Sequence, residues 1–349
     1  MLSERENYIR TVRFGGPEWM PISIAILPAL WQHLGDELDK IVRRHPVLFP
    51  DYRQGDYKKR IAEGRKRGTT ERDPWGVLWE FDYDGIEGQA IEHPLDEWAK
   101  FDGFEAPDPM KFGDRWPMGW AKFHADTRSR KERGDLTSAG LDHGYFLMRL
   151  WYLRGFENLM LDFATGEPKL RELCEMLTRR NCTIIEQFVK AGLDRVYLGE
   201  DIGTQTASII SPKAFRQWVV PYYKRMMGPL NQAGIIVYTH SDGYIMELVD
   251  DLLDCGVDTL NPQDLCNGLD NIERHIKGRC CIKLDIDRQS IVPFGTPREI
   301  EELIEEEVKR LGSPQGGLSM VVGMLPPTPA ENCEALFCAF EKYRTYFSE

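Results

Sequence analysis

From residue 144 to residue 349 the sequence repeats one pattern: a short apolar run, a few polar residues and then an amphipathic segment. The runs are rich in Val, Ile, Leu and Tyr, which is typical of buried parallel strands, and the amphipathic segments have helical spacing. Six such alternations with short connections require parallel strands and right-handed crossovers. For a chain of 349 residues, this pattern predicts the α/β class and a closed (β/α)8 TIM-type barrel.

Several helices of this part have recognisable starts. Ser211 is the expected N-cap of a helix that has Pro212 in its first turn, and Thr296 and Thr328 are the expected N-caps of the last two helices. The segment 144–163 is expected to begin as a strand and continue as a helix. Strands are expected at 196–199, 235–239, 257–263, 281–284 and 316–323.

The first 143 residues are less regular. We interpret 1–72 as an N-terminal extension with a charged peripheral arm, although the apolar run at 17–31 has the composition of a first strand. The stretch 107–143 is rich in Pro, Trp and charge, and we expect a loop-rich insertion that serves as a lid or as a homodimer contact. The chain is expected to form one domain over 1–349.

Composition excludes several classes of function. The net charge of −12 and the pI near 5.2 oppose binding to nucleic acid, because most of the surface would repel a phosphate backbone. No window approaches the roughly 20 apolar residues that span a bilayer, and the charged N-terminus lacks an apolar signal core. A cytoplasmic protein that acts on a small molecule is therefore expected.

The cysteines and glycines carry no recognisable cofactor motif. The eight cysteines form no CxxC pair and are expected to be reduced, with Cys266 and Cys281 as the candidates for a thiolate metal ligand. A small buried side chain is the commoner role for such a cysteine. No GxGxxG sequence follows a strand and opens a helix, so a Rossmann dinucleotide site is not expected.

Polar residues gather where four successive strands are expected to end. In parallel α/β folds these ends lie at one edge of the sheet and surround one site, whereas a single Asp or Asn there often only caps a helix. Together, the four ends predict a functional site. The polar residues are Glu200, Asp201 and Gln205 after the first strand, His240 and Asp242 after the second, Asn261 and Gln263 after the third, and Asp285, Asp287, Arg288 and Gln289 after the fourth.

One imidazole among several carboxylates has two interpretations. Glu200, His240 and Asp242 can provide three ligands to zinc or another divalent metal and leave one position open for a substrate. Without a metal, Asp242 can instead orient His240 as a general base. In both cases His240 and Asp242 are the candidate catalytic residues, with Glu200 added in the metal site.

The order of several motifs resembles the uroporphyrinogen decarboxylase superfamily. The similar segments are GxxxxRxxYLRGFENLMLDF from Gly144, GEDIGTQTASIISPKAF from Gly199, HSDG from His240, CGVDTLNPQ from Cys255 and the C-terminal PPTPAENCEAL. The superfamily contains the decarboxylase of heme synthesis and cobalamin-linked methyltransferases, and it implies a (β/α)8 barrel. The resemblance covers residues 140–349 strongly and 1–110 loosely.

Departures from the family patterns favour the methyltransferase branch. Where the decarboxylase has an RQAGR motif, this chain has Arg13 followed by Phe14 and two glycines. Where the decarboxylase has a histidine in the turn of its last strand, this chain has Val322-Gly323-Met324 and no imidazole. The zinc methyltransferases carry HxCG where this chain has His240-Ser241-Asp242-Gly243, so the thiolate is missing. A site of oxygen and nitrogen ligands suits an ether or alcohol oxygen better than a thiol.

The resemblance therefore implies an enzyme, a methyltransferase that moves a methyl group from a methoxylated small molecule to a corrinoid. The chain lacks a DxHxxG corrinoid signature, so a separate corrinoid protein is the expected partner. Trp79 has strand spacing and fits a core position as well as a pocket wall. The residues expected to hold the substrate are Asp201, Gln205, Tyr152, Trp79, Asp285 and Arg288.

Two alternatives are compatible with the same sequence. In the first, the chain is a metal-free decarboxylase of a carboxylated molecule, in which Arg13 or Arg288 binds carboxylates and Asp73 or Asp242 stabilises the developing cation. In the second, the chain is a non-catalytic binder of a tetrapyrrole or corrinoid that uses its Trp-rich N-terminal half as a platform.

Overall fold

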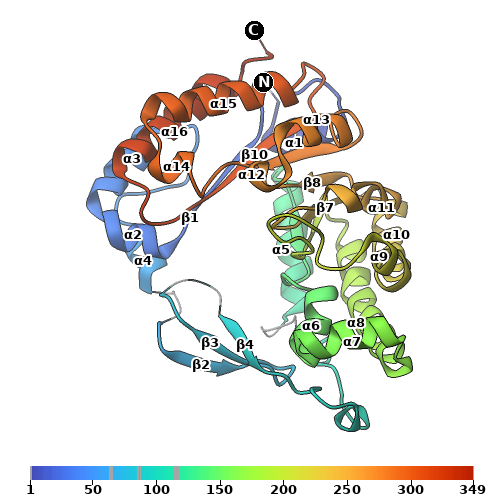
Figure 1. Cartoon of the computed structure of the whole chain (residues 1–349). Coiled ribbons are helices and arrows are strands. Elements are labelled where there is room, and N and C mark those ends of the chain that lie inside the picture. The colour runs from blue at the N-terminus through green and yellow to red at the C-terminus, as the bar shows by residue number, and fades with distance from the viewer. Residues whose placement is uncertain (1, 63–65, 85, 87, 113–117, 349) are drawn as a thin grey trace.

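A seven-stranded sheet dominates the described part of the chain (Figure 1), which in this computed structural model comprises residues 2–62, 66–84, 86, 88–112 and 118–348. Neighbouring strands of the sheet run parallel, and their order is β1-β10-β9-β8-β7-β6-β5. The strands are β1 (Ile22–Ile26), β5 (Ser138–Gly140), β6 (Arg195–Gly199), β7 (Ile236–His240), β8 (Thr259–Asn261), β9 (Cys281–Asp285) and β10 (Leu318–Met324).

The sheet curls into a half-barrel, which confirms the predicted TIM-type α/β class. Within the described residues it has seven strands, and β1 and β5 stand at its two ends without pairing to each other. The registers place Gly199 beside His240 and His240 beside Asn261, so the carboxyl ends of β6, β7 and β8 are level. Residues that follow these strands therefore meet at one edge.

A small antiparallel sheet occupies the part of the chain between β1 and β5. It consists of β2 (Thr69–Arg72), β3 (Leu78–Phe81) and β4 (Gln89–Glu92) in the order β2-β3-β4. Asp73 closes the β2–β3 turn by accepting hydrogen bonds from the backbone N–H groups of Trp75 and Val77. Alternate residues Trp79 and Phe81 are buried, as the period of two in the sequence predicts. Figure 1 shows this sheet apart from the main one.

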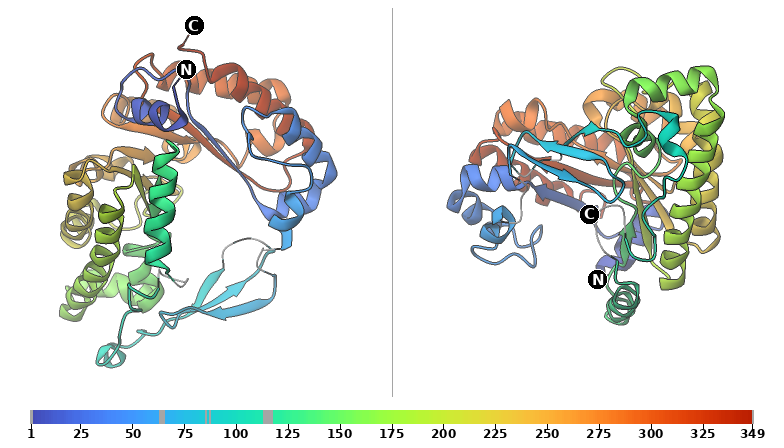
Figure 2. Two further views of the ribbon diagram at one scale, coloured as in Figure 1. Left: turned by 180° about the vertical axis from the view of Figure 1, so that it is seen from behind. Right: turned by 90° about the horizontal axis from the view of Figure 1, so that it is seen from below.

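Helices cover the convex face of the main sheet (Figures 1 and 2), where α8 packs against α10 and α15 against α16. The helices of the described residues are α1 (Glu4–Val12), α2 (Pro28–Leu34), α3 (Asp36–Arg44), α4 (Tyr57–Ala62), α5 (Trp120–Glu132), α6 (Leu147–Arg154), α7 (Phe156–Thr165), α8 (Pro168–Ala191), α9 (Pro212–Trp218), α10 (Val220–Gln232), α11 (Val249–Asp254), α12 (Asp264–Asn267), α13 (Leu269–His275), α14 (Ile291–Phe294), α15 (Pro297–Leu311) and α16 (Ala330–Tyr343), with the 3-10 turns η1 (Trp98–Phe101) and η2 (Met246–Leu248).

The predicted helix starts are confirmed at two of three caps. Ser211 accepts a hydrogen bond from Ala214 N–H, and Thr296 forms a capping box with Glu299. Thr328 is not an N-cap, because α16 begins at Ala330 and its N-cap residue is Pro329. The Thr328 hydroxyl instead donates to the carbonyl of Leu325.

Two other expectations need correction. Residues 144–146 form no strand, and the segment becomes helical at Leu147, because the strand of this repeat is the short β5 just before it. The stretch 107–143 is only partly loop-rich, since it contains the 13-residue α5 and also β5, which belongs to the main sheet. Residues 113–117 of that stretch lie outside the described part.

The alternation of side chains along the strands separates a helix-facing layer from a concave face. Val196 and Leu198 of β6 are fully buried under the helices, whereas Arg195, Tyr197 and Gly199 belong to the opposite, concave face. The same parity places His240 on the concave face. None of the described helices is long and apolar enough to cross a membrane.

Candidate metal centre at the carboxyl ends of the strands

His240, the last residue of β7, is held by the strand beside it. Its Nδ1 lies 2.8 Å from Oδ1 of Asn261 at the end of β8. The amide group of Asn261 donates to the carbonyl of Lys283, and its Oδ1 also accepts from the Tyr238 hydroxyl. Because that oxygen is an acceptor, Nδ1 of His240 carries a proton, and Nε2 is the nitrogen that faces Asp201 and Asp242.

A second histidine faces His240 across the mouth of the half-barrel, which is the opening at the carboxyl ends of its strands. His143 follows β5, and its ring centre lies 5.6 Å from that of His240. Nδ1 of His143 is 3.4 Å from the hydroxyl of Tyr197, and Nε2 is 3.1 Å from Oδ2 of Asp201. The other oxygen of Asp201 lies 3.7 Å from Nε2 of His240. Asp201 therefore stands between two imidazoles.

The donor atoms of His143, Asp201 and His240 fit a divalent metal. All three lie within 4.8 Å of one another. A tetrahedral zinc site with bonds of about 2.0–2.2 Å separates its ligand atoms by roughly 3.4 Å, which is close to the distances from Asp201 to the two histidines. Two imidazoles and one carboxylate are also a usual catalytic zinc set with one open position. The side chains of His143 and Asp201 are 39% and 29% exposed, so a small molecule can reach them.

A second group of ligand-type residues lies between α3 and α16, away from the mouth, and is less suited to a metal. It consists of His45, Glu334 and Cys338. Arg44 already donates to both oxygens of Glu334, at 3.2 and 2.6 Å. A cation bound there would have to displace or tolerate that guanidinium.

Asp242 lies at the rim of the same mouth, between a cation and an imidazole. A terminal nitrogen of Arg288 donates to both of its oxygens, at 2.8 and 3.0 Å, and Nε2 of His240 is 3.4 Å away. The guanidinium lies 3.5 Å from Asp285 and passes over Gly323 of β10, where a Cβ atom would come within 3.1 Å of it. Arg288 thus occupies the space that a side chain at Gly323 would need.

The electrostatics of the mouth favour an ionised Asp201 beside a protonated His240. Burial opposes ionisation of Asp201, but the hydrogen bond and charge of His143 and the charge of His240 lower its pKa to about 2. Burial likewise lowers the pKa of His240, yet Asp242 and Asp201 outweigh it, so that pKa is raised. Asp285 differs, because burial raises its pKa to about 6. Without a metal, a proton on His240 offsets the negative charge of Asp201 and Asp242 beside it.

Glu200, predicted as a metal ligand, does not face this mouth. It is 1% exposed, and one oxygen accepts hydrogen bonds from the backbone N–H groups of Phe146 and Met148 at 2.7 and 2.9 Å. The other accepts from the Tyr223 hydroxyl. The reason is parity, because Glu200 continues the helix-facing side of β6 and Asp201 the concave side. Glu200 fixes the start of α6, and burial raises its pKa to about 7.

The remaining predicted substrate residues are spread around the rim. Gln205 is exposed and accepts a hydrogen bond from the thiol of Cys266 at 3.3 Å. Tyr152 packs beside Gly144 and Met148, and its ring meets Trp79 edge-on with centres 4.7 Å apart. Trp79 itself is 3% exposed and donates to Asp73, so its surroundings are those of a core residue.

The residues named for the two alternative functions lie away from the mouth, apart from Arg288 and Asp242. Arg13 pairs with Asp258 just before β8, at the opposite end of the strands. Asp73 is buried in the β2–β3 turn and pairs with Arg149. Trp75 is 2% exposed, so its ring is not available as a surface on which a tetrapyrrole could stack.

Sequence reasoning missed His143 and the orienting role of Asn261. His143 lies in the stretch interpreted as an insertion, where no strand was expected, although it follows β5 much as Asp242 follows β7. The signal was weak because β5 has only three residues. The acceptor role of Asn261 depends on contacts with Tyr238 and Lys283 that no local pattern reveals.

Residues 79–343 match the uroporphyrinogen decarboxylase family, which is more than half of the chain. No curated protein sequence gives a significant match. The solved structures provide a comparison of folds.

A methyltransferase from Methanosarcina mazei has a similar fold over nearly its entire length, with a TM-score of 0.67 and 16% identity, covering 98% of this chain and 99% of that one. A B12-independent methionine synthase from Shewanella sp. W3-18-1 covers 66% of this chain and 68% of that chain, with 14% identity and a TM-score of 0.45. At these identities the likeness shows the fold alone.

Proposed function

Because this chain belongs to the uroporphyrinogen decarboxylase family, we propose that it is a metal-assisted methyltransferase that moves a methyl group from a methoxylated small molecule to a separate corrinoid protein. The likeness to a whole methyltransferase fold supports this branch of function. The observation that carries the proposal is the convergence of His143, Asp201 and His240 at the strand ends.

The ligand types favour an oxygen-containing methyl donor. A divalent ion held by two imidazoles and a carboxylate would act as a Lewis acid toward an ether or alcohol oxygen. In the transfer, the bond between the methyl carbon and that oxygen breaks and its electron pair stays on oxygen. The electron pair of the new bond to the methyl carbon comes from cobalt(I) of the corrinoid, which acts as the methyl acceptor.

The protein's own residues orient this site. Asp201 separates the two histidines, while Asn261 and Tyr197 hold the histidine nitrogens that point away from it. Arg288, fixed by Asp242, presents a positive charge at the rim, where it can bind an anionic substituent of the substrate. In this proposal the enzyme acts in the cytoplasm, and the exposed stretch around Met110 provides a homodimer contact.

Metal analysis of protein purified without chelator tests the proposal directly. We expect about one equivalent of divalent metal per chain, and loss of methyl transfer from an aryl methyl ether to a cob(I)alamin acceptor after chelation. Readdition of zinc should restore the transfer. Full methyl transfer by metal-free protein would contradict the role of the metal, and release of CO₂ from a carboxylated substrate without any corrinoid would support the decarboxylase alternative.

The Asn261→Leu variant is expected to bind the metal more weakly by roughly 10–100-fold, the usual cost of losing an outer partner of a ligating histidine. Leu cannot accept the proton of Nδ1, so His240 loses its fixed orientation. Competition with a chromogenic chelator measures the affinity. Asn332→Leu is a matched control, because Asn332 is equally buried but binds the carbonyls of Val292 and Gly295 outside the mouth. Equal metal affinity in the two variants would contradict the role of Asn261.

A further inference from the structure

A cavity of about 240 Å³ lies at the end of the half-barrel opposite the metal centre. Its wall combines residues of α1, β1, β6, β9 and β10 with the chain after α16. The Tyr238 ring lies beside this cavity, and its hydroxyl binds Asn261 of the metal centre. The proposed methyltransferase reaction uses none of the cavity's residues, so a role for this cavity is independent of that reaction.

Two cations of this cavity share one aromatic ring. Lys283 is 7% exposed, and its Nζ lies 4.9 Å from the ring centre of Tyr238. The Arg195 guanidinium lies 5.5 Å from the same centre and 4.9 Å from that of Tyr8. Its Nε donates to the hydroxyl of Ser138. No carboxylate of the described residues lies within ion-pair distance of either cation.

Two other buried cations of the described chain have carboxylate partners. Arg149 pairs with Asp73 at 3.3 Å, and Arg154 with Asp162 at 2.8 Å. A buried ammonium without a counter-ion is costly, which is why such groups are normally paired. Burial, with the added charge of Arg195, lowers the pKa of Lys283 to about 8. An anion in the cavity would remove this cost.

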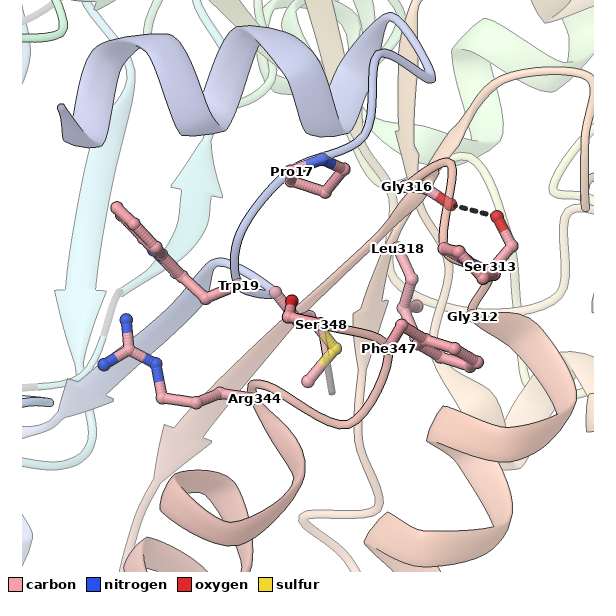
Figure 3. Close-up of a pocket in the computed structure, with 11 residues that line it drawn as sticks. Pro17, Trp19, Gly312, Ser313, Gly316, Leu318, Arg344, Phe347 and Ser348 are labelled. Atoms are coloured by element: carbon pink, nitrogen blue, oxygen red, sulfur yellow. Dashed lines mark hydrogen bonds between the residues drawn. The ribbon is translucent and has the colours of Figure 1, made fainter. Parts of the chain in front are cut away.

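The rest of the wall is suited to the body of an organic molecule. Trp19, Val47, Leu48 and Leu136 provide apolar surface, and the only carboxylate among the described lining residues is Glu4. Arg344 adds a third positive charge, with its guanidinium 5.6 Å from the Trp19 ring centre. Trp19 and Arg344 also line a neighbouring pocket of about 20 Å³. Figure 3 shows both side chains in that pocket.

We propose that this cavity binds a small organic anion, with a carboxylate or phosphate between Lys283 and Arg195 and an apolar body against Trp19 and Leu48. Such a ligand is distinct from a molecule in the metal centre, since Arg195 is the first residue of β6 and Lys283 lies in the middle of β9, before the strand ends that carry the metal centre. The two anion types differ in shape, so binding measurements can separate them.

Thermal unfolding at constant ionic strength tests the proposal, with inorganic phosphate and benzoate as the probes and benzamide as the neutral control. One or both anions should raise Tm by roughly 2–4 °C at a hundredfold excess over Kd, whereas benzamide should not. A larger effect of benzoate identifies the carboxylate, and a larger effect of phosphate identifies the phosphate. No shift with either anion overturns the proposal.

Variants locate the binding. Lys283→Met should raise the Tm of the ligand-free protein, because an unpaired buried charge is removed, and should abolish the anion-dependent shift. Lys342→Met, which removes an exposed lysine paired with Glu301, should leave the shift intact. Arg195→Gln provides a second variant in case Lys283→Met does not fold, and it should weaken the shift. A shift that disappears in Arg288→Met and persists in Lys283→Met or Arg195→Gln would place the anion in the metal centre and overturn the proposal.

Discussion

Asp201→Asn is expected to lose its divalent metal and its methyl-transfer activity, whereas Glu200→Gln, one residue earlier, is expected to keep both. The carboxylate of Asp201 lies within 3.7 Å of Nε2 of both histidines, and an amide cannot provide the same anionic ligand. The loss of affinity should exceed the roughly 10–100-fold that removal of an outer partner costs. Metal content by elemental analysis and visible absorption of the cobalt(II) form measure it.

Glu200→Gln is a sharp control because it changes the adjacent carboxyl in the same way. The Gln oxygen can still accept from the N–H groups of Phe146 and Met148, and its amide can donate to the Tyr223 hydroxyl. We therefore expect a folded protein with normal metal content. If Glu200→Gln lost the metal while Asp201→Asn retained it, the ligand set expected from the sequence would be right and the one proposed from the structure wrong.

The contrast between Glu200 and Asp201 shows which features of the site can be predicted from the sequence. The apolar runs predicted the strands and hence the parallel order that aligns their ends, because buried strands need little more than continuous hydrophobicity. That was enough to bring His240, Asp242 and Arg288 to one edge. Which of two adjacent acids faces the mouth depends on strand parity. Val196 and Leu198 are apolar and face the helices, and Glu200 follows them at the same spacing of two residues, so the sequence does indicate that Glu200 faces the helices too.

Other features were not accessible from local patterns. The half-barrel reflects how residues 69–92 pair with one another as an antiparallel sheet, and alternation alone does not say which partner a strand selects. The strand before His143 is too short to give a periodic signal. The role of the Glu200 carboxyl arises from contacts with α6 and α10, which are remote in sequence.

The segment LRGFENLMLDF contributed strongly to the family resemblance, and its charged residues have a structural role. Its Arg154 and Asp162 are 4% and 6% exposed and form a two-point ion pair, with distances of 2.8 and 3.3 Å. The Arg154 guanidinium also lies 4.0 Å from the Trp98 ring centre and donates to the carbonyl of Leu95. Trp98 in turn donates to Asp162. The motif therefore fastens the connector after β4 to α6 and α7.

Arg154→Met is expected to lower the free energy of unfolding by about 3–5 kcal/mol, because it leaves the carboxylate of Asp162 buried without its counter-ion. Urea unfolding followed by far-UV circular dichroism measures the change. The double variant Arg154→Met with Asp162→Leu should recover part of the loss, since no uncompensated charge then remains.

The exposed pair of Arg298 and Glu302 provides the matched control. The side chain of Arg298 is 85% exposed, so Arg298→Met should leave stability unchanged within error. If Arg154→Met behaved like this control, burial would not determine the strength of the pair. If the double variant were less stable than Arg154→Met alone, the loss would come from Asp162's hydrogen bond with Trp98 and not from an unpaired charge. If the double variant recovers stability and Arg298→Met leaves it unchanged, then Arg154 and Asp162 stabilise the fold and are not part of the metal centre.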